Sequence, residues 1–106
     1  MSRTLDLIRE LVGKKQLRIS EHGYDELSKD GITFSEVLKG FEEAILVEDY
    51  PEYLKGPCVL VLQRDSSGDP MHVVWGIARN TQGPAVLVTA YRPDPKRWSP
   101  DFRRRL

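Results

Sequence analysis

Two histidines are the side chains of this 106-residue chain best suited to moving a proton. His22 lies where a helix is expected to begin, and His72 lies near the start of an expected strand. Because the ordinary pKa of histidine is close to neutral pH, either ring can act as a general acid or base without a large shift. The competing interpretation is structural. In it, His22 bonds a nearby carbonyl or carboxylate, and His72 lies on the wetter face of a sheet.

A second group of candidates lies at the end of the last expected strand. There a tyrosine ring can stack on a base, and an arginine can hold a phosphate in a bidentate manner. Alternation places Leu87, Thr89 and Tyr91 on one face, which we expect to be open, and Val86, Val88 and Ala90 on the face under the helices. The prediction is an acid–base set of His22, His72 and Tyr91, with nucleic-acid contacts from Thr89, Arg92, Lys96 and Arg97.

The two ends of the chain carry opposite charge, although the net charge is zero. Residues 1–53 hold twelve acids and seven bases, whereas residues 79–106 hold seven bases and two acids. Such asymmetry predicts a basic C-terminal tail, over 95–106, that is suited to binding phosphate. The same tail is suited to clasping the acidic helices of its own chain, and the sequence leaves both interpretations open.

Composition and motifs exclude several classes of protein. A single cysteine, Cys58, excludes an internal disulfide and a thiolate-rich zinc site. There is no histidine pair at metal-ligand spacing, no glycine-rich nucleotide loop, and no G-x-S-x-G or C-x-x-C pattern, so we expect neither metal nor cofactor. No apolar run is long enough to span a membrane, and the N-terminus lacks the pattern of a signal peptide. We therefore expect a cytoplasmic protein with no membrane partner.

The sequence predicts one α+β domain over residues 1–106, with two or three helices packed on a curved antiparallel sheet of about four strands. Proline is absent before Pro51 and occurs seven times from there on, which favours helices in the first half. Helices are expected over 3–13 and, as a helical hairpin, over 20–41.

Turn and capping residues divide that hairpin into two helices. Ser20 is expected to cap the first helix, and Gly31 to end it. Thr33 begins a T-x-x-E capping box that starts the second helix. Tyr24 and Leu27 have the spacing of residues that face inward.

The second half of the chain reads as strands separated by turns. Residues 17–19 read as a short strand or extended segment. Gly76, in the middle of an expected strand, marks either a floor that admits a ligand or a place where a neighbouring aromatic ring fits. The expected strands cover residues 45–47, 59–62, 71–79 and 85–91.

Several short motifs follow one another over about residues 17–102. They are I-S-E-H-G-Y-D-E-L from Ile19, D-G-I-T from Asp30 with Glu36-Val37, the Tyr50-Pro51 loop, M-H-V-V-W from Met71, and V-T-A-Y-R-P-D-P from Val88 followed by Trp98. Their order resembles that of a bacterial family described as domain of unknown function 4258. In that family the helical motif usually carries arginines where this chain has Glu26 and Asp30.

That family is similar to the small RelE-like and BrnT-like toxins. The resemblance implies a RelE-like fold and a metal-independent ribonuclease toxin, with RNA as substrate and a cognate antitoxin protein as partner. His22 and His72 would then be the acid and base, one taking the proton of the 2′-hydroxyl and the other protonating the leaving 5′-oxygen. Tyr91 and Arg92 would contact base or phosphate. The alternative is a non-catalytic protein-interaction module of the same fold.

Overall fold

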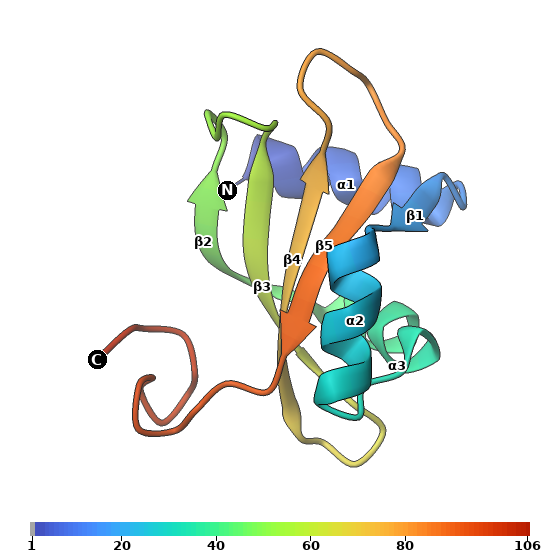
Figure 1. Cartoon of the computed structure of the whole chain (residues 1–106). Coiled ribbons are helices and arrows are strands. Elements are labelled where there is room, and N and C mark those ends of the chain that lie inside the picture. Colours follow the sequence, from blue (N-terminus) through green and yellow to red (C-terminus); the bar gives the residue numbers. More distant parts are fainter. Residues whose placement is uncertain (1) are drawn as a thin grey trace.

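Three helices and a five-stranded sheet form the computed structural model of the chain, which describes residues 2–106 (Figure 1). The helices are α1 (Arg3–Gly13), α2 (Glu21–Lys29) and α3 (Phe34–Gly40), and a 3-10 turn, η1 (Phe41–Glu43), follows the third. The helices expected over 3–13 and 20–41 are therefore confirmed. Within residues 2–106, no helix has the length and apolar character needed to cross a membrane.

The predicted caps form at both helices of the hairpin. The Ser20 hydroxyl accepts a hydrogen bond of 2.9 Å from the backbone N–H of Gly23, and the Thr33 hydroxyl accepts one of 3.1 Å from that of Glu36. The Thr33 hydroxyl also donates a hydrogen bond to the Glu36 carboxylate. This contact differs from the expected capping box, in which that carboxylate accepts from a backbone N–H. Gly31 adopts a positive φ of 64°, as a left-handed helix stop requires.

The strands are β1 (Leu17–Ile19), β2 (Ile45–Tyr50), β3 (Cys58–Arg64), β4 (Pro70–Ile77) and β5 (Ala85–Tyr91). They lie in the order β1-β5-β4-β3-β2, with β1 parallel to β5 and the other pairs antiparallel. The sheet is thus mixed and has five strands, not an antiparallel sheet of about four. After α1 the chain returns along the free edge of β5, where pairing satisfies backbone groups that would otherwise be unpaired.

One face of the sheet is covered by the helices and carries the core. Trp75 and Ile8 are fully buried there, and the Trp75 indole donates a hydrogen bond of 3.2 Å to the buried Gln63. Leu27 belongs to this core as expected, but Tyr24 is 65% exposed, so its predicted inward orientation is wrong. The close approach to β5 is made instead by Gly23, where an added Cβ would lie 2.7 Å from a backbone oxygen of Leu87.

A β-bulge at Val88 reverses the expected faces of Val86, Leu87 and Val88, but not those of Thr89, Ala90 and Tyr91. Leu87 and Thr89 both pair with β4 residues, which leaves Val88 as an extra residue between them. Leu87 is therefore buried against the helices, whereas Val86 and Val88 lie on the opposite face. The expectation that the valines of this strand pack under the helices is wrong, because strict alternation does not survive the bulge.

Candidate functional site

The face of the sheet that the helices leave uncovered has two differently built halves. At one end, cross-strand neighbours bring Leu62, His72 and Tyr91 side by side. At the other end, Cys58, Gly76 and a valine of β5 are neighbours in the same way. The C-terminal segment, residues 92–106, folds back over the first end, which we call the tail half. The second end holds a pocket, which we call the open-face pocket.

In the tail half, His72 and Tyr91 are joined by a direct hydrogen bond. The Tyr91 hydroxyl lies 3.2 Å from His72 Nδ1, and His72 Nε2 lies 2.8 Å from the backbone carbonyl of Phe102. A carbonyl can only accept, so Nε2 carries the proton and donates it, and Nδ1 accepts from the phenol. Both ring nitrogens of His72 are therefore occupied by partners within the chain.

The tail also shields His72 from water. Trp98 packs edge-on against the imidazole, with ring centroids 4.3 Å apart, and His72 is 0% exposed. This burial lowers the pKa of His72, because the imidazolium form loses its hydration. Burial likewise raises the pKa of Tyr91, so both groups stay neutral near pH 7. His72 thus lies on the sheet face away from the helices, as the structural interpretation expected, but the tail keeps it from water.

A carboxylate on β2 holds the end of the tail. Arg105 donates two hydrogen bonds to Glu48, of 2.8 and 2.9 Å, and its guanidinium lies 4.7 Å from the centroid of the Trp98 ring. The Tyr50 hydroxyl donates a third hydrogen bond of 2.7 Å to the same carboxylate. Arg105, followed by Tyr50, lowers the pKa of Glu48, so this group is ionised and fully partnered. The basic tail, residues 95–106, therefore binds its own chain at the sheet. Just before it, the backbone N–H of Arg92 donates a hydrogen bond of 2.8 Å to Asp30 at the C-terminal end of α2.

His22 does not join this cluster in the structure. It lies on α2, where its side chain is 67% exposed and its Nε2 is 3.6 Å from a carboxylate oxygen of Glu26. Among the hydrogen bonds and ion pairs of residues 2–106, none links His22 to His72 or Tyr91. The structure therefore brings together two of the three predicted acid–base residues, and the third is held on an exposed helix.

The predicted phosphate contacts have different surroundings. Arg92 forms an ion pair of 2.8 Å with Asp65 and donates to the carbonyl of Pro70, so it fastens the β3–β4 turn. The backbone N–H of Asp69 and the Arg92 guanidinium both lower the pKa of Asp65. Thr89 is half-buried beside the bulge. The last two predicted contacts are exposed tail residues, Lys96 and Arg97.

The open-face pocket has a volume of about 500 Å³ and an apolar floor. Gly76 lies in this floor, where an added Cβ would approach both Cys58 and Val88 within 3.5 Å. Of the two interpretations of Gly76, the structure shows the floor of a pocket and not a seat for an aromatic ring. Burial raises the pKa of Cys58, so it contributes a neutral thiol. The floor is formed by Cys58, Leu60, Val74, Gly76, Val86 and Val88.

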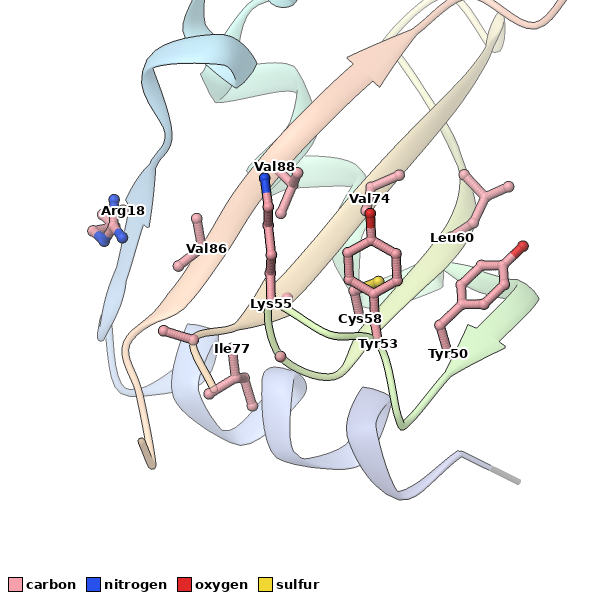
Figure 2. A pocket seen from close by; sticks show the side chains of 13 residues that line it. Arg18, Tyr50, Tyr53, Lys55, Cys58, Leu60, Val74, Ile77, Val86 and Val88 are labelled. Atoms are coloured by element: carbon pink, nitrogen blue, oxygen red, sulfur yellow. The ribbon is translucent and has the colours of Figure 1, made fainter. Parts of the chain in front are cut away.

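Cations and phenol rings form the rim of this pocket (Figure 2). Arg18 of β1 lies at one side, beyond Val86, and Tyr50 lies at the other side. Lys55 and Tyr53 come from the loop between β2 and β3, and Lys55 reaches across the opening. Tyr53 is 55% exposed and Tyr50 is 43% exposed, so both rings present apolar surface at the rim.

Several of these residues escape prediction from the sequence. Glu48 and Arg105 meet only because β2 and the tail come together in the fold, and no local spacing marks a pair so far apart in the chain. Tyr50 and Glu48 do alternate on β2, which is a signal that they share a face. Within residues 2–106 no three His, Cys, Asp or Glu side chains gather as a metal would require.

Comparison with known proteins gives one result that bears on identity. The family model described as "Domain of unknown function (DUF4258)" matches residues 19–92, more than half of the chain. No curated protein and no solved structure matches this chain. The matched region contains α2, α3 and all of β2 to β5, but not Arg18 of the pocket rim or the tail residues Trp98, Phe102 and Arg105. The chain therefore belongs to the DUF4258 family of domains of unknown function.

Proposed function

We propose that this domain is a non-catalytic protein-interaction module that binds its partner through the uncovered face of the sheet. The observation that carries the proposal is the open-face pocket itself. The pocket has a volume of about 500 Å³ above an apolar floor, and no element of the described chain covers it. Exposed apolar hollows with aromatic rims are typical of surfaces that bind other proteins.

The tail half supports the same proposal, because its polar groups already have partners within the chain. A general base needs a lone pair within reach of the substrate, and a general acid needs a proton it can deliver there. His72 is fully buried, and each of its nitrogens already has a partner. Glu48 accepts two hydrogen bonds from Arg105 and one from Tyr50. These groups hold the tail against the sheet, and none of them is free to contact a substrate while the tail is in place.

The test is capture of a partner by the tagged full chain expressed in its native cell. Tyr53→Ala and Val74→Glu alter the rim and the floor of the pocket, and Ser35→Glu on α3 is the control on the helix side. We expect a stoichiometric partner that is lost from the first two variants and kept by the control. Recovery of the chain alone would contradict the proposal, as would equal capture by all variants of confirmed fold.

RNA cleavage by a RelE-like toxin is the second candidate, and one observation favours it. His72 and Tyr91 are hydrogen bonded on the same sheet face that carries Glu48 and Arg105. An imidazole, a phenol or a carboxylate can act as general acid or base in cleavage through a 2′-hydroxyl, and a guanidinium can stabilise the negative charge that develops. In this candidate the tail would leave the site before RNA binds, and the partner protein would be an antitoxin.

Cleavage of a labelled single-stranded RNA distinguishes the two candidates. The full chain and Trp98→Ala, which loosens the tail, are incubated with the RNA in parallel. The interaction module predicts intact RNA in both reactions. Cleavage that appears with Trp98→Ala and disappears when His72→Ala is added would establish the nuclease, provided that circular dichroism shows both variants folded.

A further inference from the structure

We infer that the open-face pocket receives a large apolar side chain from a partner segment that carries carboxylates on both sides of that anchor. The inference rests on the proposed function and deepens it, because it names the chemistry of the partner. It follows from the floor, the rim and the charges of the pocket, taken in turn.

The floor selects an apolar group. Its side chains are aliphatic or a neutral thiol, and Gly76 adds backbone without a side chain. A polar group placed on this floor would lose its hydrogen bonds to water and find none in exchange. Val74 and Val88 are half-buried, so an inserted side chain would complete their burial. Each square ångström of apolar surface removed from water contributes about 25 cal/mol.

The rim selects negative charge beside that apolar group. Arg18 and Lys55 are exposed, and the residues that line the pocket include no acid. Neither cation forms an ion pair or a side-chain hydrogen bond with another group among residues 2–106. They come from β1 and from the β2–β3 loop, so they approach the opening from different elements (Figure 2). Carboxylates on both sides of the anchor would form ion pairs with Arg18 and Lys55.

The phenol rings add a wall against which an anchor can pack. Tyr50 is fixed, because its hydroxyl is bonded to Glu48. Tyr53 is more exposed and leans over the pocket from the loop. Rigid aromatic rings around an apolar floor are typical of the centre of a protein interface. A single-stranded RNA fits less well, because the polar edges of its bases would face the aliphatic floor.

The experiment selects peptides from a phage-displayed library of random dodecapeptides on the immobilised full chain. We expect enriched peptides that share one large apolar residue between aspartates or glutamates. Their affinity should fall about tenfold or more for Arg18→Glu and for Lys55→Glu, since each change sets like charges against each other. Lys39→Glu on α3 is the matched control, and it should leave the affinity unchanged.

Several outcomes would overturn the inference. Enriched peptides without acids, or peptides that bind the two charge reversals as tightly as the control, would show that the rim does not select charge. Displacement of the peptides by a labelled single-stranded RNA would assign the pocket to nucleic acid, and a dimer of the chain in gel filtration would assign it to a second copy. If no peptide is enriched but a partner is still captured through Tyr53, the inference fails and the interaction module stands.

Discussion

The two halves of the uncovered sheet face use similar residue types in opposite ways. In the tail half, an imidazole, a phenol and a guanidinium are joined to partners inside the chain, and Trp98 shields them from water. In the open-face pocket, Arg18, Lys55 and Tyr53 are exposed around an apolar floor. The comparison teaches that residue type alone does not mark a site. What distinguishes the halves is whether each polar group already has its partner.

The largest expected effect comes from removing the ring that shields the tail half. Trp98 is 5% exposed, so Trp98→Ala leaves a cavity beside His72 and should lower the free energy of unfolding by about 3 kcal/mol. Tyr53→Ala, on the pocket half, should change it by no more than about 0.5 kcal/mol. Urea denaturation of both variants checks the difference. Equal losses of stability in the two variants would contradict the view that the tail half stabilises the fold and the open-face pocket does not.

Removing the imidazole should have the next largest effect. His72→Ala leaves the Tyr91 hydroxyl and the Phe102 carbonyl without their partner in a region that the tail shields. Unpaired buried polar groups are costly, so we expect a loss of about 2 kcal/mol in the free energy of unfolding. His22→Ala, at the exposed histidine, is the control and should change stability little. A harmless His72→Ala would show that the network is not needed by the fold.

The same imidazole should make stability depend on pH. The pKa of His72 is lowered in the folded chain, whereas in the unfolded chain it has its ordinary value of 6.5. Below that pH the unfolded chain binds a proton that the folded chain resists, so stability falls as the pH decreases. Urea midpoints at about pH 7.5 and about pH 5.5 should differ for the unaltered chain and for His22→Gln. The difference should shrink for His72→Gln, and its persistence there would assign it to other groups.

The smallest expected effect concerns the ion pair at the end of the tail. Arg105 is 62% exposed, so solvent screens its attraction to Glu48. Arg105→Ala should lower the free energy of unfolding by about 0.5–1 kcal/mol, part of it through lost packing on Trp98. The loss should be smaller in 1 M NaCl. Arg104→Ala, at a neighbouring exposed cation, is the matched control. A salt-independent loss would mean that packing alone accounts for the contact.

Local signals in the sequence were sufficient for most elements of the fold. Serine and threonine caps, a glycine stop and proline placement depend on residues within one or two turns of the chain, and these predictions are confirmed at Ser20, Gly31 and Thr33. The parallel pairing of β1 with β5 joins segments far apart in the sequence. No local pattern specifies such a pairing, which is why the sheet was expected to have one strand fewer.

The site was harder to predict for the same reason. Alternation correctly placed Thr89 and Tyr91 on the face away from the helices, but the bulge reversed the expected faces of residues 86–88. Burial of His72 depends on Trp98 and on a backbone carbonyl, and no spacing in the sequence predicts either contact. The pocket is made from β1, the β2–β3 loop and all four other strands, so only the folded chain shows it.

The most direct test compares the two histidines within one molecule. Diethyl pyrocarbonate modifies accessible neutral imidazoles, and peptide mass spectrometry then reports the rate at each histidine of the full chain. The structure predicts rapid modification of His22, which is 67% exposed, and protection of His72, which is 0% exposed beneath the tail. Trp98→Ala should remove much of that protection. Equal rates at both histidines of the unaltered chain would contradict the account, because His72 would then be open to a substrate.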